Sequence, residues 1–280
     1  MVRATDVFGR RATRWLLRPV CWYFVAFAPE RRRVSRAFLR RALGREPTLG
    51  DLVRHFHAFA ATTHDRVALL RDRHEQFDIE LHGRDALERA LDSGRGCILL
   101  GSHLGSFEVL RALGRVAGVR NVSIVMYERG AAHTARALSR VAPQLHDRII
   151  APGRPDTMLK VKERLERGEI VGMLSDRTFR GARARRCSFL GAPASFPLGP
   201  LLVAAALGAP VVTFFGLYMG GSRYEVWLET LADGGDVPRA ERVRRAADWL
   251  ETFVARLERH ARRAPYNWFN FYDFWREEVR

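Results

Sequence analysis

The chain has 280 residues, 47% of them apolar, which is enough to bury the core of one sizeable α/β domain. Its formal net charge is +16, almost all of it from arginine, because Lys160 and Lys162 are the only lysines. Such a charge favours anionic partners, such as acidic lipid surfaces or acidic proteins. It is accompanied by no zinc-ligand spacing, aromatic RNA-binding motif or recognition helix, so we do not expect nucleic-acid binding.

The cysteines indicate a reducing compartment. Cys21, Cys97 and Cys187 lie far apart in the chain and form no CxxC pair. None of them has neighbours that would activate a nucleophile, and no spacing of potential ligands predicts a metal site.

The N-terminal segment combines apolar, aromatic and basic residues. The uninterrupted apolar run at 20–28 is too short to cross a bilayer. Trp22 and Tyr23, with arginines on both sides, are typical of the lipid headgroup boundary. We therefore expect residues 1–29 to form an interfacial anchor helix, followed by one domain over residues 30–280. A buried first helix is the alternative.

The remaining chain alternates between helical and strand patterns. Residues 30–75 are predicted to be helical, with Thr48 and Asp51 forming a helix cap. Further strands are expected at 77–81, 97–101, 122–127, 148–150, 170–174, 210–218 and 224–228, and further helices at 85–91, 109–116, 135–141, 157–167, 201–207 and 239–263. Residues 179–200 are expected to be a loop. This order predicts an α/β fold with a mixed, mostly parallel central sheet flanked by helices, preceded by a membrane-contacting helical segment.

A histidine and a glutamate follow the strand at 97–101. Glu108 lies five positions after His103, a separation of about 140° on a continuous helix. We therefore expect a turn that holds His103, then a helix start from which the Glu108 carboxylate folds back onto the imidazole. An imidazole held by a carboxylate is a general base. The alternative is a polar turn, capped by Ser102 or Ser106, beside a surface glutamate.

Charged residues also follow two other predicted strands. Asp176 and Arg177 come after the strand at 170–174, and Arg129 comes after the strand at 122–127. The carboxyl ends of parallel strands share one edge of a sheet, where α/β proteins bind ligands. Arg180 begins an arginine-rich stretch suited to phosphate or carboxylate. A salt-bridged turn and a solvated surface are the alternatives.

The aromatic residues concentrated at 265–275 have two interpretations. They could pack onto the body of the domain, which is the more common role, or form an apolar wall for an acyl chain.

Taken in order, these features resemble a known family. The His103-x4-Glu108 pair, the turn at Asp176 and the Phe-Leu-Gly-x-Pro-Ala stretch at 189–194 before an alanine-rich helix resemble HtrB-type lipid A biosynthesis acyltransferases, of the lysophospholipid acyltransferase superfamily. The resemblance extends over about residues 10–275. Arg177 departs from the family's usual Asp-Gln pair, and residues 127–130 depart from its Arg-Pro-x-Asn stretch. The aromatic end is similar to that of relatives associated with aryl polyene lipids.

The resemblance implies a glycerolipid acyltransferase-like fold and a membrane-associated O-acyltransferase. Such an enzyme moves a fatty or polyene acyl group from an acyl carrier protein thioester to a hydroxyl of a lipid or glycolipid. His103 would be the base and Glu108 the group that orients it. The expected substrate-binding residues are Ser106, Arg129, Asp176, Arg177 and Arg180. The donors expected for the oxyanion are the backbone N–H groups at Gly105 and Ser106, or Arg129 or Arg177.

The resemblance also implies the setting of the reaction. We expect no cofactor and no metal. The expected partners are an acidic acyl carrier protein and an anionic membrane surface, at the cytoplasmic face of the bacterial inner membrane. Two alternatives remain: a thioester hydrolase that uses the same pair on water, and a non-catalytic acyl-carrier- or lipid-binding protein.

Overall fold

A computed structural model describes residues 13–71, 73–92, 94–110, 122–126, 148–154, 156–178 and 181–276. The strands of its main sheet are β1 (Asp78–His82), β2 (Ile98–Gly101), β3 (Val122–Val125), β4 (Ile149–Ile150), β5 (Ile170–Leu174), β8 (Val211–Gly220) and β9 (Arg223–Ala232). Its helices are α2 (Leu17–Phe27), α3 (Pro29–Leu43), α4 (Leu49–Leu70), α5 (Arg84–Asp92), α8 (Thr157–Glu166), α9 (Gly199–Leu207) and α10 (Arg242–Arg263), with the 3-10 turns η1 (His74–Gln76) and η2 (Phe107–Val109).

The sheet is mixed but mostly parallel, which confirms the predicted α/β class with a central sheet flanked by helices. Its strand order is β1-β9-β8-β2-β5-β3-β4. In the described part of the chain, β8 and β9 are antiparallel, and the other neighbouring pairs run parallel. Within the described ranges, α5 lies between β1 and β2, α8 between β4 and β5, and α9 between β5 and β8 in the chain, as crossovers between parallel strands require.

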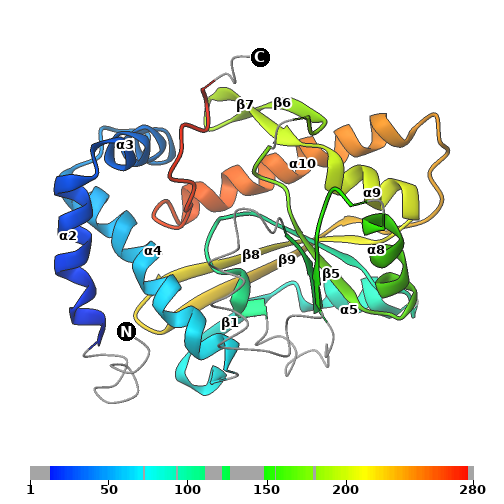
Figure 1. The fold of residues 1–280 in the computed structure, drawn as a ribbon, viewed down its shortest axis with the longest axis horizontal. Coiled ribbons are helices and arrows are strands. Elements are labelled where there is room, and N and C mark those ends of the chain that lie inside the picture. The colour runs from blue at the N-terminus through cyan, green and yellow to red at the C-terminus, as the bar shows by residue number, and fades with distance from the viewer. Residues whose placement is uncertain are drawn as a thin grey trace.

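The sheet carries a hydrophobic core on each face. Ile98 and Leu100 of β2 belong to one core, and Cys97 and Leu99 belong to the other, because side chains alternate along a strand. Helices α8, α9 and α10, with residues of α2, α3 and the first half of α4, supply the first core, whereas α5 and the second half of α4 supply the second. Figure 1 shows α10 across one face of the sheet, and α2, α3 and α4 together at one end.

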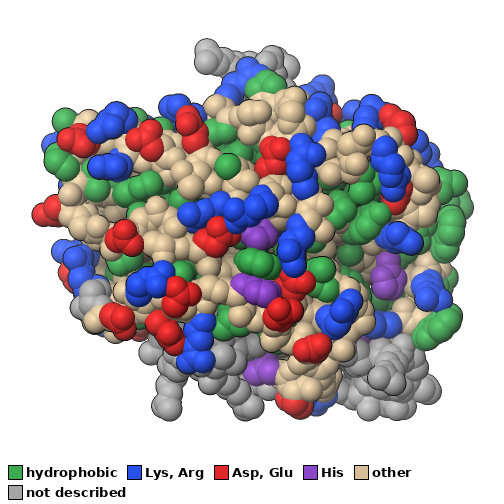
Figure 2. All heavy atoms as spheres, turned by 180° about the vertical axis from the view of Figure 1, so that it is seen from behind, with side chains coloured by type: hydrophobic (Ala, Val, Ile, Leu, Met, Phe, Trp, Pro, Cys, Tyr) green, Lys and Arg blue, Asp and Glu red, His purple; other side chains and the backbone are tan. Residues whose placement is uncertain are grey.

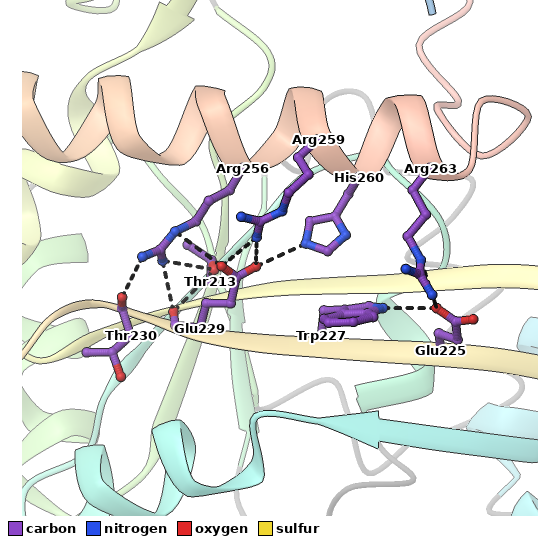
Figure 3. Close-up of polar contacts among 9 residues, drawn as sticks. All are labelled: Thr213, Glu225, Trp227, Glu229, Thr230, Arg256, Arg259, His260 and Arg263. Carbon is purple, nitrogen blue, oxygen red and sulfur yellow. Dashed lines mark hydrogen bonds and ion pairs between the residues drawn. The ribbon is translucent and has the colours of Figure 1, made fainter. Parts of the chain in front are cut away.

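Polar contacts attach α10 to β8 and β9 (Figure 3). The Glu229 carboxylate on β9 accepts hydrogen bonds from Arg259 at 2.5 Å and from His260 at 3.0 Å. Arg256 donates to the Thr230 carbonyl at 2.8 Å. The hydrogen bond from His260 and the neighbouring arginines, against the opposing effect of burial, hold the pKa of Glu229 at about 2. This carboxylate therefore stays ionised and keeps the C-terminal helix in register with the sheet.

Two local predictions have different outcomes. Thr48 and Asp51 form the predicted cap of α4, with reciprocal side-chain and backbone hydrogen bonds. The loop predicted at 179–200 is wrong over most of its length, because β6 (Ala184–Phe189) and β7 (Ala192–Pro197) form an antiparallel hairpin. Its two-residue turn has positive φ at Leu190 (51°) and Gly191 (76°), as tight hairpins require.

The N-terminal helix α2 is amphipathic. Leu17, Cys21 and Val25 are buried against the domain. On the outer side, Trp22 and Phe27 expose 53% and 71% of their surface. Within the described ranges, no helix is both long enough and apolar enough to cross a membrane.

Candidate active site

The site lies where β2 and β5 end. The two strands are parallel neighbours with Gly101 opposite Leu174, so the residues two positions beyond each end emerge side by side. These residues are His103 and Asp176. The imidazole Nδ1 of His103 donates to Oδ1 of Asp176 at 2.8 Å. The sequence expectation that both residues share one sheet edge is therefore realised as a direct hydrogen bond.

Asp176 is a fully buried carboxylate with several donors around it. Its Oδ2 accepts from the backbone N–H of His103 at 2.8 Å, from the Asn270 amide at 2.8 Å and from the Trp268 indole at 3.2 Å. Burial alone would raise the pKa of Asp176, but the charge and hydrogen bonds of His103, together with Arg177, outweigh burial and lower it. The carboxylate is therefore ionised and positioned to stabilise a positive charge on His103.

The segment after α10 holds this arrangement in place. Leu104 and Trp268 form an antiparallel bridge, in which the N–H of Phe269 donates to the His103 carbonyl at 2.9 Å. The Asn267 side chain accepts from the backbone N–H of Tyr218 on β8 and donates to its carbonyl. Trp268 is completely buried. The C-terminal aromatic segment thus packs onto the body of the domain and fixes the histidine turn.

A second histidine supports the same segment from the helical side. His55 of α4 is buried, and burial lowers its pKa to about 4, so its imidazole is neutral. Its Nε2 donates to the Trp268 carbonyl at 2.9 Å, and its Nδ1 accepts from the Ser35 hydroxyl at 2.7 Å. The support therefore runs from α3 and α4 through Trp268 to Asp176.

The turn requires glycine at position 105. Gly105 has a φ of +78°, and a Cβ atom there would lie 1.9 Å from the Gly216 carbonyl oxygen. Its N–H donates to the Asn267 carbonyl at 2.8 Å, and the N–H of Ser106 donates to the Gly216 carbonyl at 2.8 Å. These two amides were expected as oxyanion donors. They already serve backbone carbonyls, so that expectation needs correction.

The Glu108 carboxylate does not make the expected contact with the His103 imidazole and has other partners instead. Glu108 accepts from the Ser106 hydroxyl at 3.0 Å and pairs with Arg66 of α4 at 2.6 Å. The physical reason is the tight η2 turn, from which the carboxylate reaches α4 instead of β5. The carboxylate bound to His103 Nδ1 is Asp176.

The other predicted substrate contacts have mixed placements. Ser106 and Asp176 expose only 3% and 0% of their surface, so both support the turn from within the protein. Arg177 is half-buried, donates to the Asn270 side chain at 2.7 Å and lies over the Tyr272 ring. Arg129 and Arg180 lie outside the described residues, as do most of the helices predicted at 109–116 and 135–141.

Sequence reasoning missed three supporting residues: His55, Trp268 and Asn270. The signal for Asn270 was present, because amide side chains inside an apolar aromatic run need buried hydrogen-bond partners. His55 and Trp268 carried no such signal, since their contacts depend on chain segments far apart in the sequence. Across the part of the chain that the structure covers, no three His, Cys, Asp or Glu side chains group as metal ligands.

Comparison with known proteins assigns the chain to a family. A search of curated proteins finds no match. The family model described as bacterial lipid A biosynthesis acyltransferase matches residues 1–277, a span that includes all of the site residues above. The match supports a lipid acyltransferase role with a lipid acceptor. The chain belongs to the bacterial lipid A biosynthesis acyltransferase family.

Proposed function

We propose that this protein is an O-acyltransferase that moves a fatty or polyene acyl group from an acyl carrier protein thioester to a hydroxyl of a lipid or glycolipid, with His103 as the general base. The observation that carries the proposal is the hydrogen bond from His103 to the buried, ionised Asp176. With Nδ1 donating to Asp176, the lone pair of the neutral imidazole is on Nε2. The His103 side chain keeps 27% of its surface exposed, and in this proposal Nε2 faces the substrate.

The reaction follows from this arrangement. Nε2 of His103 takes the proton of the acceptor hydroxyl while that oxygen attacks the thioester carbonyl carbon. The imidazolium is stabilised by Asp176 until the tetrahedral intermediate collapses. The carbon–sulfur bond then breaks, and the same proton passes to the departing thiolate. The sequence ends with an ester and a free carrier thiol, without a covalent enzyme intermediate.

The other predicted residues have supporting roles in this proposal. Glu108 positions the turn through Ser106 and Arg66 rather than orienting the imidazole. Of the predicted oxyanion donors, Arg177 lies within the described residues, directly after Asp176, and in this proposal it stabilises the oxyanion. Arg129 and Arg180 remain predicted substrate contacts.

The donor and the location are inferred from charge and from the N-terminal helix. A net charge of +16 favours docking of an acidic carrier protein and of an anionic membrane surface. The aromatic outer side of α2 suits peripheral or monotopic binding at the headgroup level. We place the protein at the cytoplasmic face of the bacterial inner membrane, with residues 1–29 as its anchor. Within the family, we propose that the protein belongs to the branch associated with aryl polyene lipids.

The experiment incubates the purified protein with an acyl carrier protein thioester and bacterial lipids, followed by mass spectrometry of both fractions. The proposal predicts a lipid that has gained one acyl ester, in an amount equal to the carrier thiol released. Release of free fatty acid without a lipid ester would favour a thioester hydrolase. Lipid binding without loss of thioester would favour a non-catalytic binding protein.

A further inference from the structure

A half-open cavity of about 480 Å³ lies between α2, α4 and the C-terminal segment. This volume is within the range of small-molecule sites. Its walls are apolar and include Leu17, Val20 and Phe24 from α2, Phe56 and Phe59 from α4, and Phe271.

The apolar surface continues from the cavity onto the outside of the protein. Val20 and Phe24 are each 45% exposed, and Phe59 is 41% exposed. The outer side of α2 adds Trp22 and Phe27, both more than half exposed. Figure 2 shows hydrophobic side chains gathered at the right-hand edge, where α2 lies in that view. A contiguous exposed apolar patch of this kind indicates a binding surface.

The cavity also has positive charge around it. Arg31, Arg71 and Arg73 line it, and all three are exposed. The carboxylate among the lining residues, Asp65, is fully buried and is engaged by Arg14 at 2.6 Å and by the Tyr224 hydroxyl at 2.8 Å. Its charge is therefore compensated, and the formal charges of the lining residues sum to a positive value. Apolar walls with a cationic rim match a ligand that has an apolar tail and an anionic head.

The cavity is separate from the proposed catalytic site. Among the residues that line it, none comes from the turn at 102–108. Phe269 contacts both regions: its ring lies 5.4 Å from the ring of Phe59, and its N–H donates to the His103 carbonyl. Phe269 therefore packs between a ring that lines the cavity and the histidine turn.

We propose that this cavity binds one acyl chain of an anionic amphiphile, with its head group at Arg71 and Arg73, which follow the end of α4. The tail would fill the space between α2 and α4 and cover their exposed apolar side chains. The head group would pair with guanidinium groups, which bind phosphate and carboxylate well. The proposal does not depend on acyl transfer, since it involves neither His103 nor Asp176.

The test measures binding by isothermal titration, with each amphiphile kept below its critical micelle concentration. The probes are palmitoyl-lysophosphatidylglycerol (anionic), palmitoyl-lysophosphatidylcholine (zwitterionic) and palmitate (a free carboxylate). We expect one anionic lysolipid per protein and an affinity at least about fivefold above that for the zwitterionic one. If palmitate binds as tightly as the anionic lysolipid, the natural ligand is a free fatty acid. If palmitate binds more weakly, the natural ligand carries a lipid head group.

Two variants test the location against matched controls. Thr63 is an exposed residue in the cavity wall, so Thr63→Phe fills the cavity with little effect on folding. It should weaken binding at least about tenfold, whereas Thr252→Phe, on the exposed side of α10, should not. The double variant Arg71→Gln/Arg73→Gln should remove the preference for the anionic lysolipid, whereas Arg244→Gln should retain it.

The outcomes separate this proposal from the proposed function. His103→Ala should bind the anionic lysolipid as the wild type does, within about twofold. Equal binding by Thr63→Phe and the wild type, or loss of binding in His103→Ala, would overturn the proposed site. Equal affinity for both lysolipids would overturn the proposal that the arginines bind the head group. If neither lysolipid binds, the lipid site is overturned and the apolar patch is assigned to a protein partner instead.

Discussion

The substitution Asp176→Asn tests the proposed catalytic pair with little change in shape. Three N–H donors reach Oδ2 of Asp176: the His103 backbone, Trp268 and Asn270. The single carbonyl oxygen of asparagine can take that position and keep all three bonds. Its NH2 group then faces His103 Nδ1, which must become the acceptor. The ring proton moves to Nε2, so the nitrogen that faces the substrate can no longer accept a proton.

The expected loss is large for activity and small for stability. In Ser-His-Asp triads the equivalent change lowers kcat about 10⁴-fold through this same wrong tautomer. We expect a loss of about 10³- to 10⁴-fold here, or about 4 to 5.5 kcal/mol of transition-state stabilisation. The fold should lose only about 1–2 kcal/mol, because each donor still meets an acceptor.

The assay measures initial rates of transfer from the acyl carrier protein thioester, with urea denaturation as the check on folding. Glu108→Gln is the control, because Glu108 binds Ser106 and Arg66 rather than the imidazole. We expect it to lose no more than about a hundredfold in rate. A loss below tenfold in Asp176→Asn would refute the pairing. A loss in Glu108→Gln that exceeds the loss in Asp176→Asn would also refute it and would restore Glu108 as the orienting group.

Three further predictions concern the fold and the surface. Gly105→Ala should lower the melting temperature and cut the transfer rate at least about a hundredfold, because the new Cβ would lie 1.9 Å from a carbonyl oxygen. The control Gly153→Ala, at a similar φ but in open space, should cost only about 1 kcal/mol of stability. Equal effects of the two substitutions would contradict this account. The pKa of Glu229 is depressed from 4.5 to about 2, so its ionised form adds stability above pH 4.5 that is lost as the pH falls through about 2. Glu229→Gln should therefore cost about 2 kcal/mol in urea denaturation at pH 7, and less as the pH falls below 4.5; a difference independent of pH would contradict this. Replacing Trp22 and Phe27 together by serine should weaken sedimentation with anionic vesicles at least about fivefold at low salt, and unchanged sedimentation would remove α2 as the anchor.

Much of the fold could be predicted because it depends on local patterns. Apolar runs located β2, β5 and β8, alternation located β1 and part of β9, and helical periodicity located α4, α5 and α10. The Thr48 cap could be read directly, since capping involves residues three apart. The β6–β7 hairpin was missed because small residues suggested a loop, although Cys187, Phe189, Ala194 and Phe196 alternate as buried positions of two strands.

The site could be predicted only in part. Parallel strand ends brought His103 and Asp176 to one edge, as the strand order indicated. Which carboxylate would bind the imidazole depended on the tight turn after Ser106 and on Arg66, which attracts Glu108 toward α4. Neither is visible in the spacing of the motif. The sequence indicated that Asn270 needs a buried partner, but the identity of that partner and the role of Trp268 depend on the path of the chain after α10, which only the tertiary structure reveals.

The most direct test of the central claim follows one acyl group through a single turnover. Purified protein in excess is mixed with isotopically labelled acyl carrier protein thioester and bacterial lipids, and the label is counted in lipid ester and in free fatty acid. The account predicts lipid ester as the main product of the wild type, and for His103→Ala intact thioester with no ester above the protein-free control. Equal ester formation by His103→Ala, or free fatty acid as the main wild-type product, would contradict it.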